Sequence, residues 1–328
     1  MKVLITGGAG FLGDRLARAL LALDGLPLAG AAPRRVEQLV LVDRAQPRPD
    51  LVADARVTPV TGDLGDLLPA VLDGVDLVFH LAAVVSSEAE RDFDLGMRVN
   101  LTTTMELLEA CRRQPVPPRL VFASSLAVFG STADLPLPEV ITDEVLPTPQ
   151  SSYGIQKFIG EQLVADYARR GLVPARTVRL MTVTVRPGLP NAAASSFISG
   201  IVREPLAGLP SNSPVAPETP VAVTSPARTI EGLLKAATAS DAEWGPHTAV
   251  TLPALTVSVG GIVDALARVA GPDVSALVGW EPDPAIAAIV TSWPSRFEAA
   301  RARGLGLAAD EDFDTIIRAY LIDLAKEH

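Results

Sequence analysis

Cysteine and histidine are nearly absent from this chain of 328 residues. The single cysteine, Cys111, cannot form an internal disulfide, and the three histidines, His80, His247 and His328, are too far apart to resemble a metal-ligand spacing. These absences favour a reducing compartment and argue against structural zinc. We therefore expect a cytoplasmic protein that holds no metal.

Long hydrophobic runs and an excess of positive charge are also missing. No uninterrupted apolar run reaches the roughly 18 residues that a membrane span needs. The apolar start, Met1 to Ile5, turns at once into Thr6 and glycines, so no signal-peptide core develops. Lys and Arg number 28 against 38 Asp and Glu, a net charge of −10, which suits polyanions poorly. We expect neither membrane nor nucleic-acid partners.

Apolar residues are plentiful, at 48% of the chain, and the mean hydropathy is +0.30. With 20% charged residues, this composition supports a large core and excludes global disorder. At roughly 150 residues per domain, the length suggests two domains, or one large domain with an added lobe.

Short apolar runs alternate with segments of helical period along the first half of the chain. This alternation is typical of β-α-β units, and the unbroken hydrophobicity of the runs indicates parallel strands buried on both faces. The predicted strands are Lys2–Thr6, Gln38–Val42, Val57–Thr61, Leu77–Leu81, Arg119–Ala123 and Arg176–Val185. The predicted helices here are Phe11–Leu23, Asp92–Arg113 and Ser152–Arg170.

The second of these helices carries Leu101, Met105, Leu108 and Cys111 at helical spacing, so we expect that face in the core. Cys111 there could be a reactive thiol, but a packed and inert residue is the favoured interpretation. After Pro187, proline, serine and glycine become frequent, and helical character returns at Ala227–Ala239, Val257–Ala270 and Phe313–Ala325. The chain is expected to leave the sheet there and build a second lobe.

A glycine-rich turn follows the first predicted strand and opens the first predicted helix. Gly7, Gly10 and Gly13 make a GxxGxxG spacing, in which missing side chains let backbone N–H groups and the helix N-terminus approach a diphosphate. A merely tight strand-to-helix turn is the alternative. The position of the motif at the first strand favours a dinucleotide site.

Three further strand ends agree with a dinucleotide. Asp43 can accept both ribose hydroxyls and repel a 2′-phosphate, so NAD is favoured over NADP, although Arg44 could bind that phosphate. Asp63 could touch the adenine or only cap a helix. After the fourth strand come small residues where a cofactor must pass close to the backbone, Leu81-Ala82-Ala83.

Tyr153 and Lys157 lie four residues apart on one predicted helix, so both project from one face. A nearby cation stabilises phenolate and lets a tyrosine exchange a proton with a substrate alcohol. Ser125, at the end of the fifth strand, can hydrogen-bond the same oxygen. His80 could be offered as a base instead, but a buried, satisfied histidine is the favoured interpretation.

This set of residues, with Val128-Phe129-Gly130 and Arg186-Pro187-Gly188, resembles the extended short-chain dehydrogenase/reductase superfamily from residue 1 to about 188. The resemblance implies a Rossmann domain with a parallel sheet, bound NAD and a Ser125-Tyr153-Lys157 triad. It also implies a homodimer that pairs the helices at 92–113 and 152–170. The residues then expected to bind NAD are Gly7, Gly10, Phe11, Leu12, Gly13, Asp43, Arg44, Asp63, Leu64, Leu81, Ala82, Ala83, Asn100, Ser124, Tyr153, Lys157 and Pro187. Asn100 would support the lysine through water, and Pro187 would lie by the nicotinamide carboxamide.

Two later stretches narrow the resemblance to the D-erythronate dehydrogenase family. They are RPGLPNAAASSFISGIVREPLAG from Arg186 and WPSRFEAARARGL from Trp293. The resemblance implies oxidation of a four-carbon sugar acid at C2. The residues expected at this substrate are Ser86, Ser125, Tyr153, Asn191, Ser195, Ser196 and Arg203, with Ser87 as a further candidate. Arg203 could clamp the carboxylate, or it could be a solvated charge while the serines only cap a helix.

The overall prediction is an α/β Rossmann protein, a doubly wound parallel sheet with a smaller, mostly helical C-terminal substrate lobe. Residues 1–187 would bind NAD, with 220–252 returning to that domain, and residues 188–219 and 253–328 would form the lobe. Two alternatives stay open: a nucleotide-sugar epimerase or dehydratase, and a non-catalytic NAD(P)-sensing regulator. The stereochemistry of the preferred acid is left undetermined.

Overall fold

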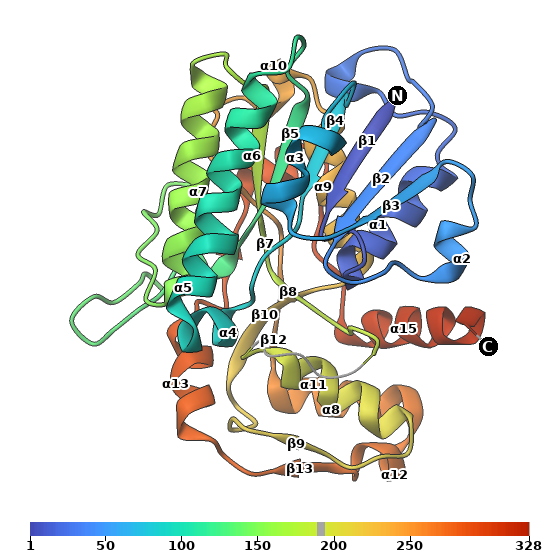
Figure 1. Cartoon of the computed structure of the whole chain (residues 1–328). Coiled ribbons are helices and arrows are strands. Elements are labelled where there is room, and N and C mark those ends of the chain that lie inside the picture. The colour runs from blue at the N-terminus through green and yellow to red at the C-terminus, as the bar shows by residue number, and fades with distance from the viewer. Residues whose placement is uncertain (189–193, 328) are drawn as a thin grey trace.

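A parallel sheet of seven strands forms the centre of the molecule (Figure 1), as seen in a computed structural model that describes residues 1–188 and 194–327. The strand order is β11-β7-β5-β4-β1-β2-β3. The strands are β1 Lys2–Thr6, β2 Gln38–Asp43, β3 Val57–Thr61, β4 Leu77–His80, β5 Arg119–Ser125, β7 Ala175–Leu180 and β11 Val250–Thr251. Every neighbouring pair is parallel, which confirms the predicted fold class.

Helices cover both faces of this sheet. Val3 and Ile5 pack in the core beneath α1 (Phe11–Ala22) and α9 (Pro226–Thr238). Leu4 points to the opposite core, because successive side chains of a strand alternate between the two faces. That second core lies beneath α3 (Leu64–Val71), α6 (Thr103–Arg112) and α7 (Ser152–Arg169).

Short elements complete this part of the molecule. Before the fifth strand come a 3-10 turn at Leu28–Gly30, α2 (Pro49–Val52), α4 (Ser86–Arg91), α5 (Phe93–Gly96) and a π-helical turn at Met97–Thr102. After it come a 3-10 turn at Leu126–Val128, β6 (Ile141–Thr142), α10 (Asp241–Trp244), β14 (Phe297–Glu298) and α14 (Ala300–Gly304). The paired strands β14 and β6 bring the late chain back beside the middle of the sequence.

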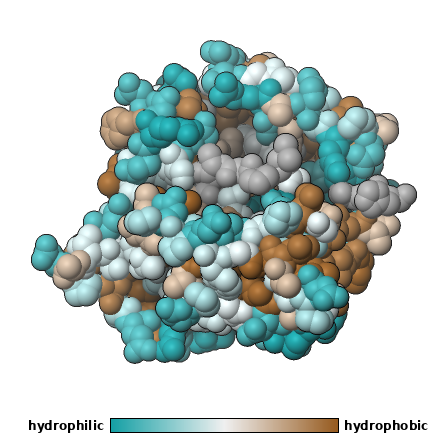
Figure 2. All heavy atoms as spheres, turned by 90° about the horizontal axis from the view of Figure 1, so that it is seen from below, coloured by the Kyte–Doolittle hydropathy of each residue, from teal (hydrophilic) through white to brown (hydrophobic). Residues whose placement is uncertain are grey.

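The second lobe lies below the sheet in Figure 1 and has its own apolar core. Its helices are α8 Ser196–Leu206, α11 Val259–Ala270, α12 Pro272–Ser275, α13 Pro284–Ser292 and α15 Phe313–Glu327. Its strands are β8 Thr182–Val183, β9 Ser211–Ser213, β10 Pro220–Thr224, β12 Leu255–Ser258 and β13 Val278–Trp280. Seen from below, apolar side chains gather on one side of this end of the molecule (Figure 2).

The predicted strand Arg176–Val185 is wrong as a single element. The chain leaves the main sheet after Leu180, and Thr182–Val183 pairs instead with β10 in a separate three-stranded sheet. Both halves are apolar, so hydrophobicity alone does not mark the point where the chain changes sheets. The helix predicted over 257–270 begins later, at Val259, because Ser258 caps it and the preceding residues form β12.

The predicted helix Asp92–Arg113 is also interrupted. It consists of α5, the π-helical turn and α6, and Met105 is 47% exposed instead of buried. A π-helical turn holds one extra residue, which changes the angular positions of the residues beyond it. The buried face of α6 is consequently carried by Thr104, Leu107, Leu108 and Cys111.

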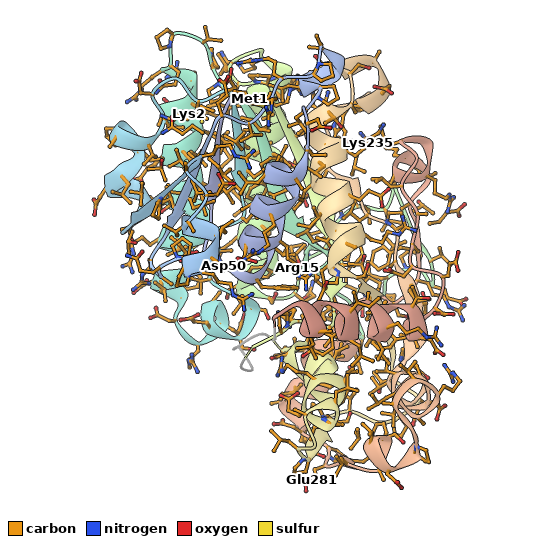
Figure 3. All side chains as sticks on the ribbon, turned by 90° about the vertical axis from the view of Figure 1, so that its right-hand side faces the viewer. Met1, Lys2, Arg15, Asp50, Lys235 and Glu281 are labelled. Atoms are coloured by element: carbon orange, nitrogen blue, oxygen red, sulfur yellow. The ribbon has the colours of Figure 1, made fainter. Side chains whose placement is uncertain are left out.

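The two parts are joined by side chains as well as by the chain. Arg15 of α1 forms a 2.7 Å ion pair with Asp323 of α15, and Figure 3 shows Arg15 beside that helix. Met1 and Lys2 lie at the end of the sheet that is farther from the lobe, and Glu281 lies at the far end of the lobe (Figure 3).

No helix in the described part of the chain is long and apolar enough to span a membrane. Nor do the described residues contain a group of acidic, histidine or cysteine side chains arranged for a metal.

Candidate active site

A cavity of about 520 Å³ opens at the carboxyl ends of the parallel strands, on the side of the sheet that faces the lobe. In open α/β sheets this edge is where ligands bind. Many of the predicted site residues line the cavity. They are Gly7, Gly10, Phe11, Leu12, Gly13, Asp43, Arg44, Asp63, Leu64, Leu81, Ala82, Ala83, Ser86, Ser124, Ser125, Tyr153, Lys157 and Ser195.

The glycine-rich turn forms one end of this cavity. A Cβ on Gly13 would lie 2.1 Å from the Gly7 carbonyl oxygen, and Gly7 itself has φ +73°. Only glycine therefore fits at these two positions. Gly10 precedes α1 and provides no side-chain cap, so the first N–H groups of the helix have no side-chain partner. The turn thus fits the diphosphate of a dinucleotide, which those N–H groups would bind.

Asp43 is fixed beside the turn at the end of β2. Its carboxylate accepts hydrogen bonds from the backbone N–H of Ala9 at 3.1 Å and of Ala45 at 3.1 Å. This places a negative charge where an adenosine ribose would lie and disfavours a 2′-phosphate. Arg44 lines the same end of the cavity but is exposed.

Asp63 caps a helix, which is one of the two roles that the sequence allowed, and it also lines the cavity. It caps α3 by accepting a 3.1 Å hydrogen bond from the Gly65 N–H, and it lines the cavity together with Leu64. On the opposite wall, Leu81, Ala82 and Ala83 follow β4. A Cβ on Gly7 would come within 2.9 Å of the Ala82 nitrogen, so this wall and the turn are in close contact.

The three catalytic candidates line the same cavity. Ser125 ends β5, and Tyr153 and Lys157 lie in the first turns of α7, whose start is capped by Ser151. The Lys157 ammonium donates a 2.9 Å hydrogen bond to the Ala123 carbonyl and lies 5.8 Å from the centre of the Tyr153 ring. The Ser125 hydroxyl accepts a 3.2 Å hydrogen bond from the Ala127 N–H and lies near enough to the Tyr153 phenol to lower its pKa.

Burial shifts the pKa values of both Tyr153 and Lys157. It raises the pKa of Tyr153 to about 12, while the Ser125 hydroxyl lowers it. It lowers the pKa of Lys157 to about 8, against the opposing effect of Glu161. The protein alone therefore holds the phenol protonated at neutral pH. Deprotonation of Tyr153, which would let it act as a base, requires further positive charge beside the ring, such as an oxidised nicotinamide would supply.

A buried ion pair lies behind the lysine. Arg179 of β7 binds both carboxylate oxygens of Glu161, at 2.9 and 2.7 Å, and Ser124 donates a 2.6 Å hydrogen bond to the same carboxylate. Glu161 stands one helical turn beyond Lys157 on α7. Ser124 lines the cavity, but its hydroxyl is committed to this carboxylate.

His80 and Cys111 take no part in the cavity. The Thr104 hydroxyl donates to the Asn100 carbonyl, so it must accept from Nε2–H of His80 at 3.0 Å, and Nδ1 then accepts from Thr6 at 2.7 Å. The imidazole is thus a neutral, fully satisfied core group, and burial lowers its pKa to about 3. Burial likewise raises the pKa of Cys111 to about 12, far from a reactive thiolate.

Asn100 is buried in the π-helical turn, and its contacts differ from those expected. Its side chain accepts from the Val84 N–H at 2.8 Å, donates to the Val84 carbonyl at 3.0 Å, and donates to Gln156 at 2.8 Å. It therefore joins the segment after β4 to the residue that precedes Lys157. It does not line the cavity wall.

Some of the residues expected to bind the substrate line the cavity, and others do not. Ser86 and Ser195 line the cavity, and the Ser86 hydroxyl accepts a 3.4 Å hydrogen bond from the Ala194 N–H. Asn191 lies outside the described residues. The expected residues that are not part of the described cavity wall are Ser87, Ser196, Pro187 and Arg203. Arg203 instead donates to the Arg186 carbonyl and pairs with Glu204.

Among the residues of the cavity wall that were not predicted as site residues are Arg186 and Trp293. Each begins one of the two stretches on which the resemblance to D-erythronate dehydrogenases rests. Their positions in those stretches were the available signal. Trp293 follows α13 of the lobe, and Arg186 follows β8, so both reach the cavity from the lobe side.

Comparison with known proteins relates this site to a family. The pattern of the NAD dependent epimerase/dehydratase family matches residues 3–217. The chain belongs to this family. The family membership confirms the predicted superfamily resemblance and, because NAD stands in the family's description, the predicted cofactor. The matched span includes every described residue of the glycine-rich turn, the Ser125-Tyr153-Lys157 group and α8.

Individual relatives of this family member match over nearly the whole chain. It is 50% identical to the D-erythronate dehydrogenase of Cupriavidus necator, with 98% of each chain covered. It is 39% identical to the D-erythronate dehydrogenase of Haemophilus influenzae, over 98% of this chain and 99% of that one. A crystal structure described as a nucleoside-diphosphate-sugar epimerase from Agrobacterium tumefaciens superimposes with a TM-score of 0.89 at 40% identity, covering 98% of this chain and 94% of that one.

Proposed function

We propose that this protein oxidises D-erythronate at C2 to 2-dehydro-D-erythronate with NAD, as a step in the breakdown of sugar acids. The observation that carries the proposal is the meeting of Ser125, Tyr153 and Lys157 in the cavity that the glycine-rich turn closes at its other end. The substrate is supported by full-length similarity to two D-erythronate dehydrogenases.

The three side chains divide the work of proton transfer. Tyr153, as phenolate, takes the proton of the C2 hydroxyl, and Ser125 hydrogen-bonds the same oxygen and holds it in place. Lys157 keeps positive charge near the phenol and, as a residue of the same cavity wall, would hold the nicotinamide ribose. When bound, NAD supplies the hydride acceptor.

A nucleotide-sugar epimerase is the second candidate, and the similarity to the Agrobacterium structure favours it. An epimerase of that kind must hold a second diphosphate and a base in its substrate lobe. Arginine pairs are the usual partners of a diphosphate, and on the lobe side the described cavity wall contains one cation, Arg186. One guanidinium matches one carboxylate better than a diphosphate.

We also propose a homodimer that pairs the outer faces of α6 and α7. Met105 on α6 is 47% exposed, and Ile155 and Ile159 on α7 are 46% and 38% exposed. Large apolar side chains grouped on neighbouring helices are typical of a face that another chain covers.

We further propose that the protein acts in the cytoplasm, where an NAD-linked catabolic step has access to a pool of the cofactor.

The deciding experiment measures NADH formation from D- and L-erythronate and D- and L-threonate, with NAD and NADP in parallel. UDP-glucose and UDP-galactose serve as sugar-nucleotide controls. Turnover of D-erythronate with NAD, and not with NADP, is the expected result. Epimerisation of a UDP-sugar without oxidation of any acid would replace the proposal with the second candidate. Cofactor binding without turnover of any substrate would favour an NAD-sensing regulator.

A further inference from the structure

Arg186 is the cation at the substrate end of the cavity. It lies at the lobe side, on a wall that also contains Ser86, Ser195 and Trp293. The catalytic candidates Tyr153 and Ser125 line the same cavity. A substrate whose reacting hydroxyl meets Tyr153 therefore has Arg186 on the wall around it.

The backbone of Arg186 is held from two sides. Its N–H donates a 3.1 Å hydrogen bond to the Ser199 hydroxyl, and its carbonyl accepts a 2.8 Å hydrogen bond from the Arg203 guanidinium. Both partners belong to α8, a helix of the lobe. Arg203, the residue expected to clamp a carboxylate, thus acts as the support of Arg186.

The positive charge of Arg186 is not balanced by an acidic side chain within the described part of the chain. Arg203 has a carboxylate partner, Glu204, whereas no described acidic side chain pairs with Arg186. One terminal nitrogen of Arg186, Nη2, is shielded from solvent and has no hydrogen-bond partner among the described residues. Burial, and then the neighbouring Arg203, lower the pKa of Arg186. Arg186 is only partly exposed, and a guanidinium nitrogen that is shielded from solvent without a partner is costly, a cost that an anionic ligand would remove.

We propose that Arg186 binds the carboxylate of the substrate and so restricts the enzyme to acids. This inference rests on the proposed function, because it assigns the carboxylate end of the same substrate. The acid group lies against the guanidinium while the neighbouring C2 hydroxyl reaches Tyr153 and Ser125. Neutral polyols of equal length leave Arg186 unpaired and bind weakly.

The test separates binding from chemistry by using 3,4-dihydroxybutanoate, which keeps the carboxylate but lacks the C2 hydroxyl. Its primary amide is the neutral match. Isothermal titration calorimetry on the NADH-bound protein measures both ligands with the wild type, Arg186→Gln and Arg186→Lys. A surface arginine of the lobe helix α15, changed in Arg318→Gln, is the matched control. NADH affinity and thermal unfolding of each variant verify the fold.

The wild type and Arg318→Gln should bind the acid about 10- to 100-fold more tightly than the amide. Arg186→Gln should lose this preference, and Arg186→Lys should keep part of it because the charge remains without the planar fork. A folded Arg186→Gln that still prefers the acid overturns the inference, as does a wild type without preference. If Arg186→Gln does not fold, the folded Arg186→Lys decides: an undiminished preference overturns the inference. An Arg186-dependent preference without turnover of D-erythronate retains the inference and rejects the proposed function.

Discussion

Tyr153 is the proposed base, and it lines the cavity together with Ser125. Tyr153→Phe removes one oxygen and leaves the ring in place. We expect kcat for the acid to fall roughly 10²- to 10⁴-fold, the usual contribution of a positioned acid or base. The affinity for NADH should not change.

Tyr167→Phe is the matched control for this prediction, because Tyr167 lies on the same helix and its hydroxyl binds Glu109 outside the cavity. It should leave kcat unchanged. Initial rates and fluorescence titration with NADH measure the two quantities. If Tyr153→Phe keeps most of its activity, Tyr153 is not the base.

His80 makes the stability of the protein depend on pH. Its pKa is about 3 in the folded chain against an ordinary value of 6.5, because burial disfavours the charged imidazole. Between these values the unfolded chain binds a proton that the folded chain does not, so stability rises with pH across this window. The free energy of unfolding should therefore lose up to about 1.4 kcal/mol per pH unit as the pH falls below 6.5.

Urea unfolding at several pH values between about 4 and 7 measures this slope. His80→Gln keeps a donor and an acceptor toward Thr6 and Thr104 and should make the slope shallower by this amount. His247 is exposed, and His247→Gln should retain the wild-type slope. Equal slopes for His80→Gln and the wild type would show that His80 is not responsible.

At the scale of elements, the glycine-rich turn is the most constrained segment of the site. Gly13→Ala places a Cβ 2.1 Å from the Gly7 carbonyl oxygen, a distance that only a backbone shift can relieve. The shift moves the turn and the first turn of α1 away from the diphosphate. We expect the Kd for NADH to rise roughly 10- to 100-fold.

Gly304→Ala provides the comparison, because a Cβ there meets nothing within 4 Å and the residue lies in α14. It should leave NADH affinity unchanged and increase stability slightly, since alanine is the better helix former. Calorimetric titration with NADH measures both variants. Unchanged affinity in Gly13→Ala would mean that the turn does not hold the diphosphate.

The elements of the sheet could be predicted because buried parallel strands are continuous apolar runs, and β1 and β3 have the predicted bounds. The lobe strands could not, because β8 to β10 and β12 are short and their pairing depends on contacts distant in sequence. The exposure of Met105 was missed for a related reason. A π-helical turn has no distinct residue pattern, and it alters which side chains of α6 face the core.

The site residues also differ in whether they could be predicted from local sequence patterns. Gly7, Gly13, Tyr153 and Lys157 form local patterns next to predictable elements, so the sequence identifies them. Arg186 and Arg203 are separated by 17 residues, and sequence spacing does not say which guanidinium reaches the cavity. The fold decides it, because α8 packs with Arg203 behind the segment that carries Arg186.

At the scale of the whole molecule, the proposed dimer can be tested by introducing charge into its interface. Ile155→Glu combined with Ile159→Glu places two carboxylates on the outer face of α7. Burying unpaired charge is costly, so we expect a dimeric wild type and a monomeric double variant in sedimentation velocity experiments. Leu209→Glu, at an exposed leucine of the lobe, should remain dimeric. A monomeric wild type would contradict the proposal.

The chain crosses between the sheet and the lobe several times, for example after β7, between β10 and α9, and between β11 and β12. Because of these crossings, one of the two helices that cover Val3 and Ile5, α9, comes from beyond residue 225, and so does the edge strand β11. A fragment that ends near residue 187 would leave one face of its sheet without α9. We therefore expect residues 1–187 not to fold on their own, so a substrate lobe transferred between relatives would have to bring α9 and β11 with it.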